Sequence, residues 1–593
     1  MPGPATAPHR KQADAVWPWL ALLSVAVALY FFGLGSFYAP TNGDEMVYIH
    51  IARLTAASGD WLPLVSDLDH MRNTKPPMLF WQSFIASHWG ANWSLVALRL
   101  PSVVYTLSTA AAVAWCAKQM RGDWRTGVLA ALIYLAFFST FRYCRVFLTS
   151  APETFWLSVP VAFVLWSELA RRPRSHPVTW RARPLLACFS LLGLCMGIGL
   201  LYKSFALVAP AAATLWCVLL INAAPRWSSL WKVTLAVAWS AVLALGVFAL
   251  WFALDPDPAA VWQEFVVGEN AGKLAGGQGY WHAALWGDYP LWTQLLAYLE
   301  NAGLLLFVVL GLAMAGVKRL AKGPVWAQTP PAQRILWLWL LVWLLVFSIP
   351  SQRSARYVIP AMPALAILLA LHWERIARIW FLLTLLIASV ALVILGRIAW
   401  VVGDMDIASP WTRGLAMAAV VAGLASAIAA LVRSNWSRNA ALVGCFSVYA
   451  CFGLMVAPLD SAQAQFPASA LSQLSGKRVA VPNGFTAQYE RFHFILPDST
   501  LVPFDVAGRN TGALHPEMPD APRLAFLLAN FDAVIWLDND SQAIAPRCAP
   551  QCTVLGYRWH VKSRHKSGEV TLSNLWYPQQ WLFGREWLLT AQP

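Results

Sequence analysis

Long apolar stretches recur along most of the chain and constrain its fold more than any other feature. A helix that crosses the hydrocarbon core of a bilayer needs about 20 predominantly apolar residues. About thirteen runs approach this length, near residues 17–37, 94–117, 127–141, 153–170, 184–201, 204–222, 231–253, 291–316, 335–350, 356–372, 379–401, 414–432 and 440–458. Only 12% of the residues are charged, against about a quarter in soluble proteins. The sequence therefore predicts a polytopic α-helical membrane protein and excludes a soluble multidomain enzyme.

The distribution of basic residues predicts how the chain is oriented. The net charge of +14 comes from short basic clusters between the apolar runs, which is not the pattern of a nucleic-acid-binding protein. If the N-terminus is cytoplasmic, the cytoplasmic connections carry twenty of the lysines and arginines and the opposite side carries ten. This bias follows the positive-inside rule. With an odd number of spans, the C-terminal segment then lies outside, in the periplasm of a bacterial inner membrane.

Three parts follow from this reading: a cytoplasmic tail at 1–16, a transmembrane domain at 17–460 and a C-terminal periplasmic α/β domain at 475–593. Two outer loops, 38–93 and 254–290, are long enough to carry function. In the first, DEMVYIHIARLTAASGDW predicts a helix lying along the membrane surface. In the last part, KRVAVP, FDAVIWLD and TVLGYRWHV read as strands and LAFLLANF as a helix.

Two cysteines stand apart from the rest. Seven of the nine lie in or beside apolar runs, where a thiol behaves as a small hydrophobe. Cys548 and Cys552 lie in the polar C-terminal segment, and we expect a disulfide between them if that segment is in an oxidising compartment. A metal site at this pair is less favoured, because no histidine stands nearby at ligand spacing.

The strongest local signal follows the first predicted span. There the chain reads PTNGDEMVYIHIARLTAASGDW, and NTKPPMLFW follows in the same loop. This acidic pair with a later Lys-Pro-Pro resembles the opening of the polyprenyl-phosphate-sugar glycosyltransferases of the GT-C membrane fold, in particular the bacterial lipid A aminoarabinose (4-amino-4-deoxy-L-arabinose) transferases and the related protein mannosyltransferase-like family. GLLYKSFALVAP, GENAGK and SIPSQRSARYVIPAMPALA resemble later family segments in the same order.

The resemblance implies roles for particular residues. Asp44 and Glu153 are the predicted catalytic carboxylates, and the predicted donor-phosphate or substrate-binding residues are Glu45, Tyr48, Lys75, Lys203, Lys273, Arg353, Arg356 and Tyr357. The chemistry agrees in kind, because cations stabilise a departing phosphate and a carboxylate accepts the proton of an acceptor hydroxyl. If the acceptor is itself an ionised phosphate, Asp44 would instead orient the acceptor or the sugar.

Two positions depart from the family pattern. Val47 stands where relatives often have an arginine three residues after the first aspartate. Relatives also often carry a second aspartate at the outer start of the fourth span, where this chain has Ser150 and Ala151. Glu153 is the nearest carboxylate, and it replaces that aspartate only if the helix start is shifted or its longer side chain reaches back.

Simpler roles stay open at this stage. Asp44 and Glu45 suit the N-terminal end of a helix dipole, and Lys75 before two prolines suits a turn. Lys203, Arg353 and Arg356 lie at positions from which long basic side chains reach lipid headgroups.

We therefore expect a glycosyltransferase that moves a sugar from an undecaprenyl-phosphate donor to lipid A or another envelope acceptor. The alternatives are a flippase for a lipid-linked sugar and a non-catalytic relative that acts in glycan assembly. A flippase predicts charged sites near the bilayer midplane, whereas the candidates here cluster at one face. We expect a monomer among membrane lipids, with no nucleic-acid partner. No cofactor is indicated; a divalent metal is not excluded, although Asp44 with Glu45 would be a sparse site for it.

Overall fold

The structure is a computed structural model. It describes residues 16–37, 43–68, 71–170, 182–221, 227–271, 280–321, 325–405, 409–460, 465–484, 486–506, 520–538, 548, 552–562, 565 and 567–592. The predicted tail at 1–16 falls outside these ranges except for its last residue, and Lys273 also falls outside them.

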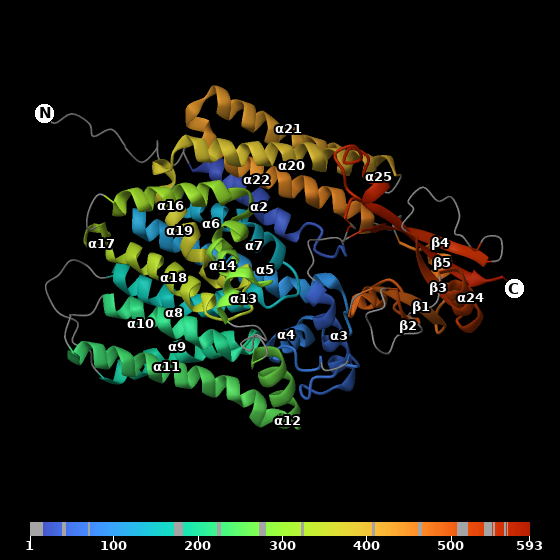
Figure 1. The fold of residues 1–593 in the computed structure, drawn as a ribbon, viewed down its shortest axis with the longest axis horizontal. Helices are drawn as coiled ribbons and strands as arrows, with labels where there is room; N and C mark the ends of the chain where they lie inside the picture. Colours follow the sequence, from blue (N-terminus) through green and yellow to red (C-terminus); the bar gives the residue numbers. More distant parts are fainter. Residues whose placement is uncertain are drawn as a thin grey trace, which may run out of the picture.

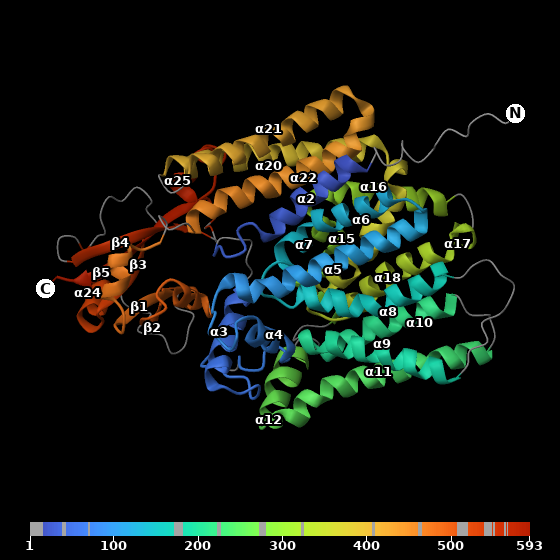
Figure 2. The same ribbon diagram turned by 180° about the vertical axis from the view of Figure 1, so that it is seen from behind.

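Long helices form a bundle in which they lie roughly side by side, and a β-sheet lies beyond one end of the bundle (Figures 1 and 2). Within the described ranges, eight helical segments are long and apolar enough to cross a membrane, and four further apolar helices are shorter. All thirteen predicted runs fall on helical segments. A polytopic helical membrane protein is therefore confirmed, while the count of thirteen spans stays a prediction.

The helices of the bundle have the following bounds. They are α2 (Trp17–Phe31), α5 (Leu95–Arg121), α6 (Trp124–Ala136), α8 (Ser150–Ala170), α9 (Ala182–Tyr202), η1 (Phe205–Leu207), α10 (Val208–Ile221), α11 (Trp227–Leu254), α15 (Ala297–Ala302), η4 (Gly303–Leu305), α16 (Leu306–Leu320), α18 (Pro331–Ser348), η5 (Ala355–Ala361), α19 (Met362–His372), η6 (Trp373–Arg375), α20 (Arg378–Asp404), α21 (Pro410–Val432), η7 (Ser434–Trp436), α22 (Ser437–Val456) and η8 (Ala457–Asp460).

Local sequence signals explain where these helices begin and end. Ser94 caps α5 by accepting a hydrogen bond from the backbone of Ala97, and Gly122 ends it in the left-handed conformation. Asp123 then caps α6. This tight turn between α5 and α6 belongs to the connections predicted to be cytoplasmic.

Helix α19 lies at the centre of the bundle. Every residue from Met362 to His372 is buried, whereas the outer helices α11 and α21 leave most of their apolar surface uncovered. A helix that is apolar all round belongs inside other helices, and a helix with an uncovered apolar face suits lipid. The segment η5 directly precedes α19, so its position is fixed by a helix that is buried on all sides.

Short helices fill the end of the bundle that faces the sheet. In the first predicted outer loop these are α3 (Gly43–Ser58) and α4 (Met78–Ala86), which lie between the bundle and the sheet (Figures 1 and 2). The short helices in the rest of the chain are α7 (Phe138–Tyr143), α12 (Pro258–Val261), the π-helical η2 (Trp262–Asn270), α13 (Tyr280–Trp286) and α14 (Leu291–Leu295). The short helix α17 (Val325–Gln328) lies at the opposite end of the bundle (Figures 1 and 2).

The C-terminal part is built on a five-stranded sheet of order β2-β1-β3-β5-β4. Strands β1, β2 and β3 are parallel, and β5 runs antiparallel to both β3 and β4. The elements are α23 (Ala468–Gln473), β1 (Arg478–Asn483), η10 (Gln488–Phe494), β2 (Thr500–Asp505), α24 (Asp520–Asn530), β3 (Ala533–Asp538), β4 (Cys552–Val561), α25 (Pro578–Trp581) and β5 (Phe583–Ala591).

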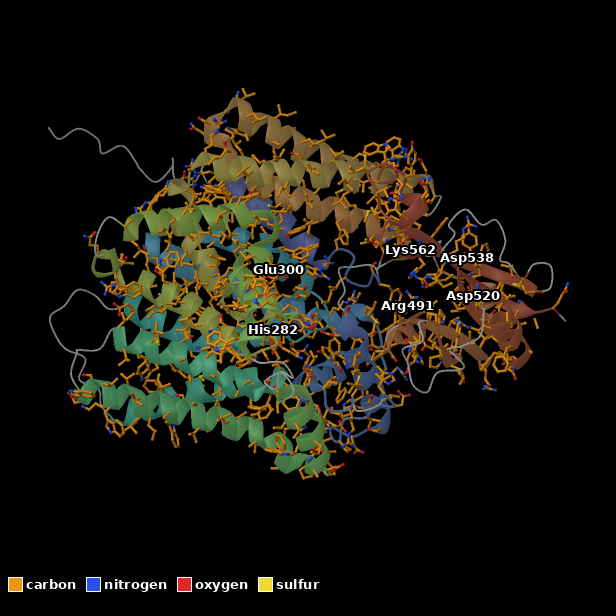
Figure 3. All side chains as sticks on the ribbon, viewed as in Figure 1. His282, Glu300, Arg491, Asp520, Asp538 and Lys562 are labelled. Carbon is orange, nitrogen blue, oxygen red and sulfur yellow. A yellow bond between two sulfur atoms is a disulfide. The ribbon has the colours of Figure 1, made fainter. Side chains whose placement is uncertain are left out.

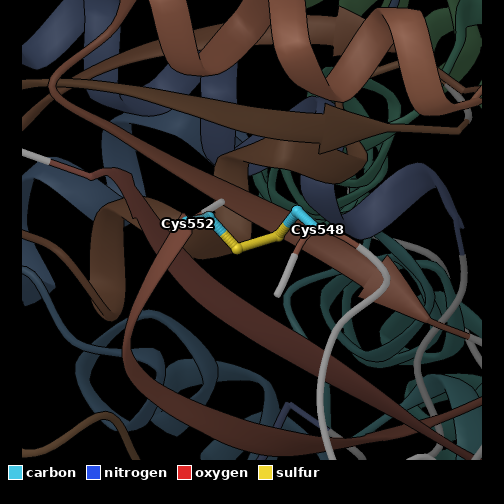
Figure 4. Close-up of a disulfide and its surroundings, with 2 residues drawn as sticks. All are labelled: Cys548 and Cys552. Carbon is cyan, nitrogen blue, oxygen red and sulfur yellow. A yellow bond between two sulfur atoms is a disulfide. The ribbon is translucent and has the colours of Figure 1, made fainter. Parts of the chain in front are cut away.

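The sequence located three of these strands and missed two. The predicted strands coincide with β1, β3 and β4, and the predicted helix with α24. Strand β2 contains Pro503, which an edge strand tolerates. Strand β5 carries Arg585 and Glu586 in its first half, so its sequence did not resemble that of a buried strand. Cys548 and Cys552 form a disulfide at the start of β4 (Figure 4).

Helix α3 forms as predicted, but its polar face is covered. His50 and Arg53 on this face both bind Glu490 on η10, with distances of 2.9 Å from Nδ1 to Oε2 and 2.5 Å from Nε to Oε1. The other ring nitrogen of His50 lies 2.6 Å from Oδ1 of Asp67. The C-terminal part therefore packs on α3 through buried charges, instead of leaving this face in water.

The next residue of η10, Arg491, binds the sheet and not α3. Arg491 pairs with the fully buried Glu586 on β5, and Figure 3 shows Arg491 between the sheet and α3. Two neighbouring residues, Glu490 and Arg491, thus connect α3 to the sheet.

Three pKa shifts accompany this contact. Burial lowers the pKa of His50, but its hydrogen bonds to Asp67 and Glu490 outweigh burial and raise the pKa overall. The hydrogen bond from His50 lowers the pKa of Asp67. Burial raises the pKa of Glu490, yet its bonds to His50 and Arg53 lower it overall.

The sign of the pH dependence follows from these directions. The contribution of His50 is complete below its usual pKa of about 6.5 and is lost as the pH rises through its raised value. The contributions of Asp67 and Glu490 are present above about pH 4 and are lost as the pH falls through their lowered values. The contact is therefore strongest between about pH 4.5 and 6.5.

We predict that His50→Gln lowers the thermal unfolding midpoint of the purified protein, and that the difference from wild type shrinks as the pH rises from about 6 to about 9. Unfolding measured in one detergent across this range checks the prediction. His88→Asn, which changes an exposed histidine of the same loop, should show no such trend. A difference for His50→Gln that is independent of pH would contradict the ion-pair explanation.

Candidate functional site

Three ion pairs meet where the helices of the bundle end beneath α3, and the first joins Asp44 to Arg356. Asp44 lies in the first turn of α3, and Arg356 lies on η5, far away in the sequence. Nη1 of Arg356 is 3.1 Å from Oδ2 of Asp44, and the two side chains are 37% and 40% exposed. This carboxylate is the more accessible of the two predicted catalytic carboxylates.

The second pair joins Lys203 and Glu153. Nζ of Lys203, which follows α9, is 2.7 Å from Oε1 of Glu153 in the first turn of α8. Glu153 is fully buried, and Thr149 donates a hydrogen bond to its other carboxylate oxygen at 3.2 Å. Since a buried carboxylate needs a partner for its charge, Glu153 holds the Lys203 ammonium in place.

The third pair joins Lys75 and Glu269. Nζ of Lys75 is 2.6 Å from Oε1 of Glu269 on η2 and donates a second hydrogen bond to the carbonyl of Thr74 at 2.7 Å. The ammonium also lies 5.8 Å from the ring centre of Tyr48. Lys75 therefore lies in the contact between the two predicted outer loops.

Each of the three cations also lies near an aromatic ring. Lys203 lies 5.7 Å from the ring centre of Tyr357, and Arg356 lies 5.6 Å from that of Tyr143. Such contacts stabilise a cation electrostatically. Tyr357, predicted to bind the donor phosphate or substrate, thus lies beside Lys203.

The three ion pairs also affect one another electrostatically. Burial lowers the pKa of the Lys203 ammonium; Glu153 opposes this effect, and the positive charges of Arg356 and Lys75 add to it. Burial raises the pKa of Tyr48, and Asp44 adds to the rise. We call Asp44, Tyr48, Lys75, Glu153, Lys203, Glu269, Arg356 and Tyr357 the charged cluster.

The two long outer loops are joined beside the charged cluster. Arg72 binds Asp257 at 3.2 Å. Glu264 accepts hydrogen bonds from the backbone and side-chain amides of Asn73, at 2.9 and 3.1 Å. These contacts fix the segment that carries Lys75 against η2, so local sequence alone does not set the position of this lysine.

Glu45, predicted to bind substrate, lies away from the charged cluster. It is fully buried and makes a bidentate ion pair with Arg99, with distances of 2.7 and 2.9 Å. Arg99 also donates to the carbonyls of Leu34 and Ser36, while Glu45 accepts from the backbone of Phe147. This pair ties the chain after α2 and the segment before α8 to the start of α3.

Two further predicted residues, Arg353 and Lys273, are not part of the charged cluster as described. Arg353 is buried and donates to the carbonyls of Ser348 and Tyr289, both at 2.9 Å, and to the hydroxyl of Tyr280. It therefore organises the chain around α13. Lys273 lies outside the described residues.

Sequence reasoning missed Arg99 and Glu269 as members of this region. Arg99 showed no signal beyond its position near a helix end, and its partner is 54 residues away. Glu269 lies in the segment GENAGK, which resembles a family motif. Its position in that motif could have identified it as a candidate residue. The described residues hold no cluster of three or more histidines, cysteines or carboxylates that could bind a metal ion.

Comparisons with known proteins agree with this arrangement. The family described as dolichyl-phosphate-mannose-protein mannosyltransferase matches residues 16–263. The chain is 28% identical over 372 residues to an undecaprenyl phosphate-α-4-amino-4-deoxy-L-arabinose arabinosyl transferase of Sodalis glossinidius, a match that covers 60% of this chain and 59% of the relative. A transferase of the same description from Edwardsiella ictaluri is 28% identical, with 56% of this chain and 55% of the relative covered. The matched part thus spans less than two thirds of either relative.

A solved structure has the same fold over nearly the whole length. The crystal structure of ArnT from Cupriavidus metallidurans bound to undecaprenyl phosphate matches with a TM-score of 0.59 and 17% identity, covering 97% of this chain and 98% of that chain. This protein is therefore a multi-pass helical membrane protein with the GT-C fold. In sequence it is similar to the undecaprenyl-phosphate aminoarabinose transferases, as the residues of the first outer loop had indicated.

The structure predicts different consequences for the two neighbours Asp44 and Glu45. Glu45→Gln leaves the buried Arg99 without its charge partner and should cost about 3–5 kcal/mol of stability. Asp44→Asn changes a side chain that is 40% exposed and should cost less than about 1 kcal/mol. Denaturation midpoints of the two purified variants check this. Equal midpoints would show that Glu45 contributes no more to stability than Asp44 does.

Proposed function

We propose that this protein is a glycosyltransferase that moves one sugar from a polyprenyl-phosphate donor to an acceptor of the cell envelope. The observation that carries this proposal is the charged cluster, in which Lys75, Lys203 and Arg356 converge at one end of a membrane bundle. A polyprenyl tail must stay in lipid while its phosphate reaches polar groups, and cations at the helix ends meet both requirements.

The reaction breaks the bond between the anomeric carbon and the phosphate oxygen of the donor. An acceptor oxygen forms the new bond to that carbon, and the polyprenyl phosphate leaves with the electron pair and additional negative charge. Lys75 and Lys203 stabilise this charge electrostatically in a partly enclosed site. Arg356 is a third donor, and its planar guanidinium suits bidentate binding of phosphate.

Asp44 is the proposed group for the acceptor. Asp44 is partly exposed and Glu153 is fully buried, so of the two predicted catalytic carboxylates Asp44 is the one that an incoming molecule can reach. It takes the proton if the acceptor is a hydroxyl, and it orients the acceptor if that is an ionised phosphate. Glu153 is proposed to stand for the family's second aspartate by holding Lys203, which makes it a positioning residue instead of the catalytic one predicted from the sequence.

The names of the relatives suggest the substrate class. The similar enzymes of Sodalis and Edwardsiella are described as transferring 4-amino-4-deoxy-L-arabinose from undecaprenyl phosphate. We propose undecaprenyl phosphate as carrier, this sugar as the first donor to test, and a lipid A-like molecule as the first acceptor. The proposed location is the inner membrane, with a cytoplasmic N-terminus and with the charged cluster and the C-terminal sheet in the periplasm.

Transfer in vitro tests the proposal. Purified protein is mixed with a panel of undecaprenyl-phosphate sugars and envelope lipids, and the products are read by mass spectrometry. We predict that wild type adds a sugar mass, that Asp44→Asn lowers kcat/KM by about 10²–10⁴-fold, and that Lys75→Ala lowers it by about 10²–10³-fold.

A matched control is Asp123→Asn, which makes the same chemical change at the far end of the bundle, where asparagine caps α6 equally well. Its activity should equal that of wild type. Binding of donor without any transfer to any acceptor would instead favour a non-catalytic role, and movement of the lipid-linked sugar across vesicles without product would favour a flippase.

A further inference from the structure

Each cation of the charged cluster lies beside a carboxylate, and this arrangement affects how the cluster binds a phosphate. Each of its three cations has one carboxylate within 3.1 Å: Glu269 for Lys75, Glu153 for Lys203 and Asp44 for Arg356. An incoming anion is therefore attracted by a cation and repelled by the carboxylate that neutralises it. The carboxylates, and not the cations alone, determine how strongly an anion is held.

The three carboxylates differ in access and in support. Glu153 is fully buried and supports Lys203 from inside the protein, whereas Glu269 is 30% exposed. Lys75 has further contacts with the carbonyl of Thr74 and the ring of Tyr48. Glu269 is thus not needed to hold Lys75 in place, and its main effect there is on charge.

The position of Glu269 is fixed by its neighbours. Glu264, earlier on the same helix, binds Asn73. Asn270 accepts a hydrogen bond from Ser204 at 2.7 Å and donates one to the carbonyl of Phe265. Since Ser204 follows Lys203, these bonds hold η2 between the lysine turn after α9 and the segment that carries Lys75, with Glu269 between the two anchors.

The proposed donor and its product differ in charge. A sugar-linked polyprenyl phosphate is a phosphodiester with one negative charge. The polyprenyl phosphate that leaves is a monoester, whose second ionisation lies near pH 6 as in other phosphate monoesters. At neutral pH the product is therefore close to a dianion, and a fixed carboxylate at Lys75 repels it about twice as strongly as it repels the donor.

We propose that Glu269 sets the preference of the site for donor over product, by opposing the second negative charge of the released polyprenyl phosphate at Lys75. This inference rests on the proposed function. It assigns Glu269 a specificity role that acts through the charge at Lys75: the residue weakens retention of the product and so allows the next donor to enter.

The test measures binding of undecaprenyl phosphate in detergent micelles to purified full-length wild type and Glu269→Gln, by titration calorimetry at pH 5.5 and at pH 8. We expect Glu269→Gln to bind undecaprenyl phosphate about tenfold more tightly than wild type at pH 8 and less than about threefold more tightly at pH 5.5, where the ligand carries mostly one charge. In turnover assays the variant should show a lower kcat with stronger product inhibition.

Glu264→Gln is the matched control. It removes the same charge from the same helix, and its amide oxygen still accepts hydrogen bonds from Asn73, so it should bind undecaprenyl phosphate as wild type does. Glu269→Asp, which retains the charge, should remain within about threefold of wild type. Undecaprenol, which has the same tail without the phosphate, should bind all four proteins equally.

The outcomes separate this inference from the proposed function. If wild type does not bind undecaprenyl phosphate better than undecaprenol, the proposed function fails. If wild type binds the phosphate and Glu269→Gln binds it no more tightly at pH 8, the role of Glu269 is overturned. A gain shared equally by Glu264→Gln, or by Glu269→Asp, also overturns it, because neither change removes the negative charge from the position beside Lys75.

Discussion

The buried ion pair between Glu45 and Arg99 is the interaction on which the rest of the site depends. Arg99 belongs to α5, Glu45 to α3, and together they also bind the chain after α2 and the segment before α8. A buried charge pair with all these hydrogen bonds leaves little freedom to shift. The positions of Asp44, one residue before Glu45, and of Glu153, at the start of α8, both follow from it.

Helix α3 makes charged contacts on two opposite faces. Beneath α3, cations and carboxylates pair across elements and remain partly open, as in Asp44 with Arg356. Above it, His50 and Arg53 use the opposite face of the same helix to bind Glu490 of the C-terminal part. Helix α3 therefore lies between the charged cluster and the sheet, and it contacts both.

The outer loops act as parts of one surface instead of as connections. Arg72, Asn73 and Lys75 bind successive acidic residues of the second loop, from Asp257 to Glu269. Through Asn270 and Ser204 this surface reaches the turn that carries Lys203. Each of these contacts joins segments that follow different helices of the bundle. The bundle therefore determines the distances between the cations, and the loops supply carboxylates that pair with them.

The sequence by itself determined that the chain is a polytopic helical membrane protein and that it is similar to polyprenyl-phosphate-sugar transferases. Length of apolar runs and order of motifs are properties of the chain, so no long-range contact was needed to find Asp44, Lys75 or Lys203. Helix α24 and strands β1, β3 and β4 were found for the same reason.

Only the tertiary structure decided which of these residues act together. Asp44 and Glu45 are neighbours in sequence, but a helix turns them by about 100°, and one faces the charged cluster while the other faces Arg99. Glu269, Arg99 and Glu490 have partners 54 to 440 residues away, and Glu586 is accommodated in strand β5 by its ion pair with Arg491. Pairing of charges across a fold depends on packing, which local pattern does not contain.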